Sequence, residues 1–197
     1  MKNRTTTRRY IKLGASYMAI DKADAPKIDH VCLGVENFNI DEVHAFLTAK
    51  GDTGVNDPDG TRLQLSSADG WTSLAAQTAS PEPRDTRSLF RPVELSVVEV
   101  NVRDLGTSGA HYAKILGPSR NSDFVVGNGR LDFFVGEPGL RRFRIQVGAG
   151  FDTEEMTRKL MALGATEDKT KGVGLRFLDP DGFRVEVQPR QLGKAAA

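Results

Sequence analysis

The chain has 197 residues and a formal net charge of +1 at pH 7, which gives no electrostatic reason to expect a nucleic acid or a membrane surface as partner. Hydrophobic residues make up 39% and charged residues 27% of the sequence, as in ordinary soluble domains, and no apolar run is long enough to span a bilayer. The single cysteine, Cys32, excludes an internal disulfide. Because residues 1–9 are basic but lack the apolar stretch of a secretory signal, we expect a cytoplasmic protein.

The first third of the chain predicts, in order, a strand or hairpin arm over 10–20, a strand over 28–35, a helix over 39–51, a turn over 57–60 and a strand over 61–66. The helix prediction depends on Asn39 and Glu42, which have capping-box spacing, and on Gly51, which is typical of a C-terminal cap. The turn prediction depends on Pro58, which fixes φ, and on Gly60, which tolerates positive φ.

Residues 67–91 are rich in Ser, Thr, Ala, Pro and charge and have no sustained periodicity, so we expect a linker, with Trp71 packed on a neighbouring face. The rest of the chain predicts, in order, a strand over 95–102, a helix over 107–117, strands over 123–126 and 130–135 joined by a Gly-Asn-Gly turn, a strand over 142–147, a helix over 152–164, and strands over 175–178 and 183–187. This recurring β-α-β-β order is typical of an α+β fold with antiparallel hairpins.

Two segments of the chain repeat each other. Residues 28–66 and 142–187 each contain a strand, a helix that closes at a glycine, an Asp-Pro-Asp-Gly turn and a final strand. Asp152 and Glu155 repeat the capping-box spacing of the first helix. Such repetition indicates related structural units, and since each unit alone is too small for a good core, we expect the units to pair.

Three parts of this pattern resemble the vicinal oxygen chelate (VOC) superfamily, which includes glyoxalase I, bleomycin and fosfomycin resistance proteins and extradiol ring-cleavage dioxygenases. Ile-Asp-His-Val at 28–31 resembles the opening strand of a module, residues 101–117 resemble the opening strand, turn and helix of a leading module, and residues 179–186 resemble the closing hairpin of a trailing module. The resemblance implies a fold of paired βαβββ modules whose sheets curl around a cleft.

The same resemblance divides the chain into parts. Residues 1–66 match a partial VOC domain, with the last strand of a leading module followed by a trailing module, and residues 92–190 match a complete VOC domain. Between them lies the linker over 67–91, and residues 191–197 are expected to be a disordered tail. The missing half of the first domain suggests a truncated gene or completion by another chain, and we expect a homo-oligomer such as a dimer.

In VOC proteins a divalent metal is typically held by four positions, because the opening strand of each module supplies one ligand, often His, and its closing strand supplies a Glu or similar residue. The resemblance implies His30 and Gln64 as ligands in the N-terminal half, and Asp132 and Glu186 in the C-terminal domain. Such a donor set suits Fe, Mn, Ni or Zn.

The opening positions of the C-terminal domain are expected at Val97 and Phe143, which cannot bind a metal, so the implied metal site is degenerate there. Glu186 is the catalytic candidate of this site. It is equally consistent with an inward strand residue that is paired to Arg176 or Arg184.

The remaining polar candidates have plainer interpretations. His30 is also consistent with a core histidine whose ring bonds to the backbone, and His44 and His111 are expected to be packing or surface residues. Cys32 lacks a base within its motif and is not expected to be a nucleophile. A local basic cluster is expected to be a solvated strand edge rather than an anion site: Arg141, Arg142 and Arg144.

Three functions are compatible with this pattern. The first is a metal-dependent lyase or ring-cleavage dioxygenase that acts on a small molecule in the cleft. The second is a metal-free protein of the bleomycin-resistance type that binds or sequesters a small molecule. Apolar residues at or near the ligand positions favour it: Val97, Phe124, Phe134 and Phe143. The third is a structural domain whose sheets serve oligomerisation. In the first two cases the partner is a small molecule, and a nucleic acid or a membrane is not expected.

Overall fold

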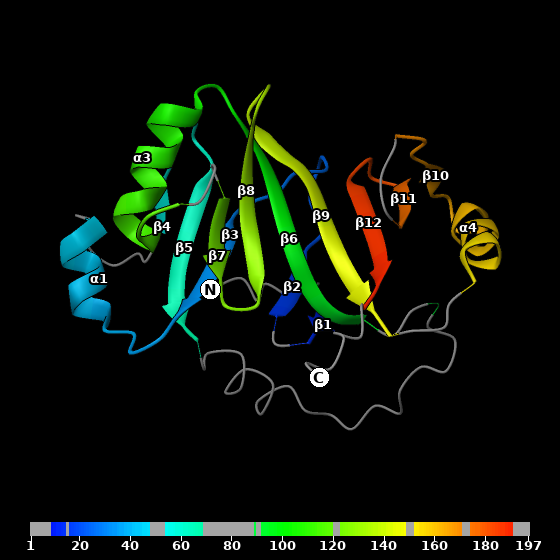
Figure 1. Ribbon diagram of the computed structural model, residues 1–197, viewed down its shortest axis with the longest axis horizontal. Helices are drawn as coiled ribbons and strands as arrows, with labels where there is room; N and C mark the ends of the chain where they lie inside the picture. The colour runs from blue at the N-terminus through cyan, green and yellow to red at the C-terminus, as the bar shows by residue number, and fades with distance from the viewer. Residues whose placement is uncertain are drawn as a thin grey trace, which may run out of the picture. The chain divides into compact units, whose positions relative to one another are not determined.

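The computed structural model of the chain describes residues 9–14, 16–47, 54–68, 89, 92–119, 123–148, 152–170 and 174–190 (Figure 1). The chain falls into two compact units, of which the first comprises residues 1–26, 85–98 and 141–197 and the second comprises residues 27–84 and 99–140. Both units combine strands with few helices, in agreement with the predicted α+β class. Within the described ranges, no helix is long and apolar enough to cross a membrane.

The first unit contains a hairpin and a mixed sheet. Its elements are β1 (Arg9–Leu13), β2 (Ser16–Ile20), the first part of β6 (Pro92–Val102), most of β9 (Gly139–Val147), α4 (Thr153–Ala162), β10 (Thr166–Glu167), β11 (Leu175–Leu178) and β12 (Arg184–Pro189). The strand order in the sheet is β10-β11-β12-β9-β6. Strand β12 pairs with β9 in parallel and with β11 in antiparallel orientation. Helix α4 lies beside β10 and β11 (Figure 1).

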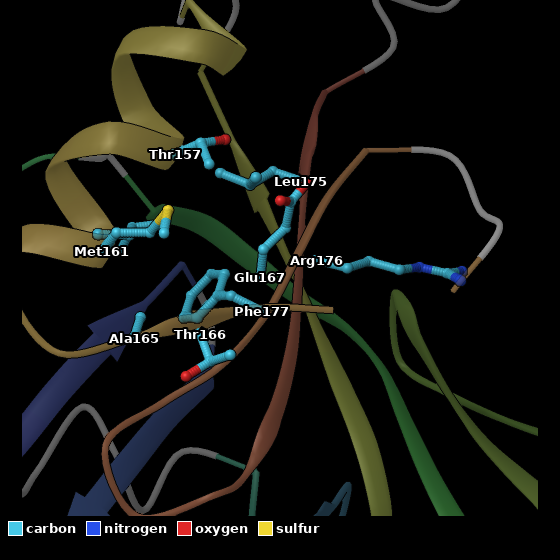
Figure 2. Close-up of a pocket in the computed structure, with 9 residues that line it drawn as sticks. Thr157, Met161, Ala165, Thr166, Glu167, Leu175, Arg176 and Phe177 are labelled. Carbon is cyan, nitrogen blue, oxygen red and sulfur yellow. The ribbon is translucent and has the colours of Figure 1, made fainter. Parts of the chain in front are cut away.

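Strict alternation separates the two faces of this sheet. Leu175 and Phe177 are buried and face α4, whereas Arg176 between them points away from the helix (Figure 2). Val185 and Val187 are likewise buried on β12. Because successive side chains of a strand point to opposite faces, the apolar residues cover one face and leave the other to polar side chains.

The β1–β2 hairpin confirms the expectation for residues 10–20, with Leu13 paired to Ser16 around the turn. Leu13 is almost fully buried. Gly14 has a φ of +68°, and a Cβ added to it would lie 1.8 Å from the carbonyl oxygen of Val93. This position therefore requires glycine both for its left-handed backbone and for the close approach of the start of β6.

The second unit contains a three-stranded sheet, two helices and further strands. Its elements are β3 (Val31–Val35), α1 (Ile40–Leu47), β4 (Gly54–Asn56), β5 (Arg62–Ser67), the end of β6, α3 (Leu105–Leu116), β7 (Asp123–Val126) and β8 (Gly129–Val135). The strand orders are β3-β5-β4 and β6-β8-β7. The predicted strand over 28–35 starts later than expected, at Val31, so His30 precedes it.

Two of the three predicted helix starts are confirmed by their caps, whereas the helix predicted from residue 107 begins earlier, at Leu105, after its cap Asp104. The Asn39 side chain accepts hydrogen bonds from the backbone N–H groups of Asp41 and Glu42, and its amide donates to the Glu42 carboxylate. Asp152 accepts from the N–H of Glu155 at 2.9 Å. In each case a side-chain oxygen satisfies an N–H that the first helical turn leaves without a partner.

The two Asp-Pro-Asp-Gly turns have the same hydrogen bonds. Asp57 Oδ1 accepts from the N–H groups of Asp59 and Thr61 at 2.9 and 2.8 Å. Asp179 Oδ1 accepts from the N–H groups of Asp181 and Phe183 at 3.0 and 2.8 Å. The glycine that closes each turn has a positive φ, +90° and +87°. The sequence repeat is therefore a repeat of local structure.

The core of the second unit centres on Tyr112 of α3. Its ring packs against Phe124 and Phe133, with ring centroids 6.2 and 4.6 Å away, and its hydroxyl donates to Asp57 Oδ2 at 3.0 Å. Tyr112 and Asp57 are both buried. Burial, followed by the charge of Asp57, raises the pKa of Tyr112 well above its ordinary value. The tyrosine thus ties α3 to the turn of residues 57–60.

Several predictions fall on residues outside the described ranges. These are the end of the first predicted helix at Gly51, Trp71 and most of the linker over 67–91, and the tail over 191–197. The division of the chain into a partial and a complete VOC domain stays a prediction.

Candidate functional site

Three strand pairs, each made of an opening and a closing strand, share one backbone arrangement and are called copies below: β3 with β5, β9 with β12, and β6 with β8. The residue after the closing strand donates its N–H to the last carbonyl of the opening strand in each copy, from Ala68 to Val35, from Gly136 to Val102 and from Arg190 to Val147. The strand registers place Cys32 beside Gln64 and Arg144 beside Glu186. In the pair of β6 with β8, counting back from the equivalent hydrogen bond between Gly136 and Val102 places Glu99 beside Asp132. Each closing position therefore has a defined neighbour on its opening strand.

Glu186 is fully buried and lies among three arginines on one face of the sheet. Its Oε2 atom is 3.1 Å from Arg142 Nη1 and 2.8 Å from Arg176 Nη2, and its Oε1 atom accepts from Arg144 Nε at 3.1 Å. The amide of Gln188 also donates to Oε1. Both carboxylate oxygens are thus held by charged donors, which are the strongest kind of hydrogen-bond partner.

The expectation of an arginine beside Glu186 is confirmed for Arg176, whereas Arg184 lies 4.0 Å from Asp168 instead. The expectation that the basic cluster forms a solvated strand edge is wrong for Arg142 and Arg144. Their strand, β9, lies between β12 and β6 in the sheet. Their side chains are only 15% and 21% exposed.

The opening position expected at Phe143 is also misplaced. Phe143 pairs with Val185, on the opposite face from Glu186, and is buried. The registers match Cys32 to Arg144, so the residue two positions earlier, His30, corresponds to Arg142. The helix cap Asp152 follows Val147 by five positions, whereas the cap Asn39 follows Val35 by four. An alignment that matches the two caps therefore shifts the strand by one residue. A shift of one residue moves the matched side chain to the other face of the sheet.

His30 lies just before β3, and Gln64 lies on β5, which pairs with β3. His30 Nδ1 is 2.8 Å from Asp29 Oδ2, and its side chain is 29% exposed. Its partner is thus a carboxylate, where the sequence suggested backbone. This hydrogen bond is the main reason that the pKa of Asp29 is lowered. Gln64 lies beside Cys32, whose Sγ is 3.3 Å from Ser66 Oγ.

Asp132 lies in a group of carboxylates in the second unit. It pairs across the strands with Asp123, and its Oδ2 atom is 2.9 Å from Arg130 Nη2. The Oδ1 atoms of Asp123 and Asp132 are buried and have no hydrogen-bond partner among the described residues. Burial raises the pKa of Asp132, and the charges of Asp123 and Glu99 add to this effect, while Arg130 opposes it.

Two cavities lie away from Glu186, His30 and Gln64, which line neither of them. The cavity beneath α4 has a volume of about 10 Å³ (Figure 2), which is near the lower limit for one water molecule. A larger hollow of about 370 Å³ lies beside the end of α3 and is lined by Leu116, Pro118, Asp123, Phe124 and Val125. Of the carboxylates discussed above, only Asp123 reaches it.

The residues around Glu186 do not fit the divalent metal that the resemblance implies. Guanidinium groups cannot donate a lone pair to a metal, and their charges repel a cation. The oxygens of Asp132 and Asp123 have the chemistry that a hard cation prefers. However, no three His, Cys, Asp or Glu side chains among the described residues form a group that could hold a metal ion.

Comparison with solved structures identifies the fold. A catechol 2,3-dioxygenase superposes with a TM-score of 0.66 and 13% identity, over 96% of this chain and 78% of that chain. The Mn(II)-bound glyoxalase from Novosphingobium aromaticivorans superposes with a TM-score of 0.61 and 17% identity, over 87% of this chain and 65% of its own. The 2,3-dioxygenase LapB from Pseudomonas sp. KL28 gives a TM-score of 0.58 and 13% identity, over 87% and 75%.

No family model and no curated protein matches the sequence. The similar structures are dioxygenases and a glyoxalase, all of the VOC superfamily. The chain therefore has the VOC fold, as its sequence predicted. At these identities the similarity defines the fold alone, and because one fold hosts several chemistries, the function has to be argued from the residues.

Proposed function

We propose that this protein binds a small organic molecule on a VOC fold and that it does so without a metal ion at Glu186. The observation that carries the proposal is the contact of three guanidinium groups with this one carboxylate. Held in this way, Glu186 positions arginine side chains instead of donating oxygen to a metal. The proposal retains the predicted pairing of βαβββ modules.

The fold supports the small-molecule part of the proposal. The similar structures include proteins named as catechol dioxygenases and a glyoxalase, and these names refer to small substrates. The polar face of β9, β11 and β12 supports the absence of a metal at Glu186, since cationic side chains occupy the neighbourhood of the closing position.

A second candidate is a metal-dependent lyase or ring-cleavage dioxygenase. One observation favours it, namely that buried Oδ1 atoms of Asp123 and Asp132 have no hydrogen-bond partner among the described residues. Such oxygens are costly to bury unless a cation or a proton satisfies them. His30 and Gln64 stay predicted ligands in this candidate, with Fe, Mn, Ni or Zn as the ion.

Metal analysis of the full chain separates the two candidates. The chelator-treated protein is incubated with Mn²⁺, Fe²⁺, Ni²⁺ or Zn²⁺, desalted and analysed by mass spectrometry of the elements. We expect Glu186→Gln to retain whatever metal the wild type retains. Stoichiometric metal in the wild type that is lost in Glu186→Gln would refute the proposal, whereas loss in Asp132→Asn or His30→Ala would support the second candidate.

Ligand binding tests the rest of the proposal. Any ligand that prefers the folded state raises the melting temperature, so we expect a concentration-dependent rise with an aromatic small molecule. A series of aromatic diols and 2-oxoaldehyde adducts that causes no shift would favour a structural role. The mass of the particle in solution, measured by light scattering, tests the predicted homo-oligomer.

A further inference from the structure

The hollow beside the end of α3 has the size and the lining of a small-molecule site. Its volume is about 370 Å³, and pockets that hold small ligands have volumes of about 300–1,000 Å³. Among the described residues no cationic side chain lines it, and all the lining residues belong to the second unit. The lining combines apolar side chains with one carboxylate: Leu116, Pro118, Phe124, Val125 and Asp123.

The negative charge of Asp123 is poorly compensated. Its Oδ1 atom is buried and has no hydrogen-bond partner among the described residues, and its Oδ2 atom is 3.9 Å from Arg130 Nη1. Arg130 donates instead to Asp132 Oδ2, at 2.9 Å. Two carboxylates therefore share one guanidinium, which leaves these three side chains with a net charge of −1. Because Oδ1 is covered while the Asp123 side chain is still 27% exposed, Oδ2 is the oxygen that a solute can reach.

The backbone adds to the negative potential at this place. Asp123 on β7 lies directly across from Asp132 on β8, and like charges that face each other on paired strands destabilise a sheet. Leu116, which lines the hollow, is also the last residue of α3. The C-terminal end of a helix carries a partial negative charge and favours cations. A cation bound beside Asp123 offsets both effects.

We propose that this hollow binds a small organic amine, whose ammonium group donates to Asp123 and whose apolar part packs on Leu116 and Val125. This inference rests on the proposed function, since it names a site and a chemical class for the small organic molecule that the protein binds. An amine fits the hollow better than a divalent metal ion does. A divalent ion needs several oxygen or nitrogen ligands, whereas the described lining offers one carboxylate and is otherwise apolar.

The test is calorimetric titration of the chelator-treated full chain at neutral pH with three probes. Benzylamine, benzyl alcohol and benzoate share one ring and differ in charge. We expect benzylamine to bind more tightly than the other two. Benzyl alcohol or benzoate that binds at least as tightly as benzylamine would overturn the amine inference and leave the proposed function standing. Failure of all three probes would also overturn the inference, whereas the proposed function is decided separately by the melting temperatures with aromatic diols and 2-oxoaldehyde adducts.

Variants assign the binding to the hollow. Asp123→Asn is expected to weaken benzylamine binding about 10-fold or more, because a hydrogen bond between charged groups is lost. Val125→Lys places a second ammonium group in the hollow and should also weaken binding, and since Val125 is 67% exposed, this variant serves where Asp123→Asn does not fold. Glu137→Gln is the matched control, because it neutralises an exposed carboxylate of the same unit that does not line the hollow, and its affinity should equal that of the wild type. Equal affinity in the wild type and both hollow variants, or an equal loss in the control, would overturn the assignment.

Discussion

The hydrogen bond between Tyr112 and Asp57 gives the sharpest prediction about the stability of the fold. Tyr112→Phe removes the hydroxyl that donates to Asp57 Oδ2 at 3.0 Å and keeps the packing of the ring on Phe133. Both partners are buried, with 2% and 5% exposure, so water does not readily replace the lost donor. A hydrogen bond to a charged group contributes about 1.5–3 kcal/mol, and we expect a loss of this size in the free energy of unfolding.

The assay is urea unfolding of the wild type, Tyr112→Phe and a control, Val135→Ala. Val135 is 66% exposed, and its substitution is expected to change the free energy of unfolding by less than about 0.5 kcal/mol. A second comparison uses the repeated turns, in which Asp57 and Asp179 make the same backbone hydrogen bonds. Asp57→Asn should therefore destabilise the fold more than Asp179→Asn does, and the difference in the free energy of unfolding should equal the contribution of the Tyr112 hydrogen bond.

The pH dependence provides an independent check of the same contact. Because the pKa of Tyr112 is raised in the folded chain, an unfolded tyrosine releases its proton at lower pH, near its ordinary value of 10.0. Above this pH the contribution of Tyr112 to stability is lost, by at most about 1.4 kcal/mol per pH unit. The wild type should lose stability more steeply than Tyr112→Phe above pH 10. Equal slopes, or a Tyr112→Phe variant as stable as the wild type, would refute the reasoning.

Three further substitutions test other parts of the structure. Gly14→Ala should lower the melting temperature more than Gly127→Ala, because both glycines have a positive φ but only Gly14 would bring a Cβ against the backbone of Val93. Asp132→Asn should stabilise the protein at neutral pH, since the raised pKa of Asp132 means that its charged form opposes folding. This gain in stability should vanish as the pH falls below 3.8, the ordinary pKa of the group. Destabilisation at neutral pH would instead indicate a bound cation. His30→Ala should raise the pKa of Asp29, which NMR titration of that carboxyl measures, because the main cause of its lowered value is removed.

The fold could be predicted from the sequence because its local signals are strong and repeated. Asn39 and Asp152 mark helix starts through a side-chain oxygen that any N-cap provides, and the paired turns specify their own hydrogen bonds through Asp57 and Asp179. These interactions join residues that are close in sequence, so the pattern alone defines them. The VOC resemblance rested on the order of these same signals.

The candidate site could be predicted only in part, because it depends on strand register. The burial of Glu186 and its contact with Arg176 followed from the alternation of two paired strands. The role of Arg142 could not be predicted in this way. One additional residue before the cap of α4 shifted the alignment of the two repeated segments, which therefore pointed to Phe143. An alignment through the strand ends, with Val35 matched to Val147, would have identified the arginine. Contacts such as that of Tyr112 with Asp57 join distant segments and have no local signal.

The central claim is that three arginines hold the carboxylate of Glu186: Arg142, Arg144 and Arg176. Chemical rescue of Glu186→Ala tests this claim most directly. Removal of one partner from a buried ion-pair network destabilises a protein by about 3–5 kcal/mol, so we expect a lower melting temperature in anion-poor buffer. Added formate should restore it in a saturable way, with little effect on the wild type or on Arg184→Gln at the same ionic strength. A variant that formate does not restore, and that has instead lost a stoichiometric divalent metal present in the wild type, would contradict the account.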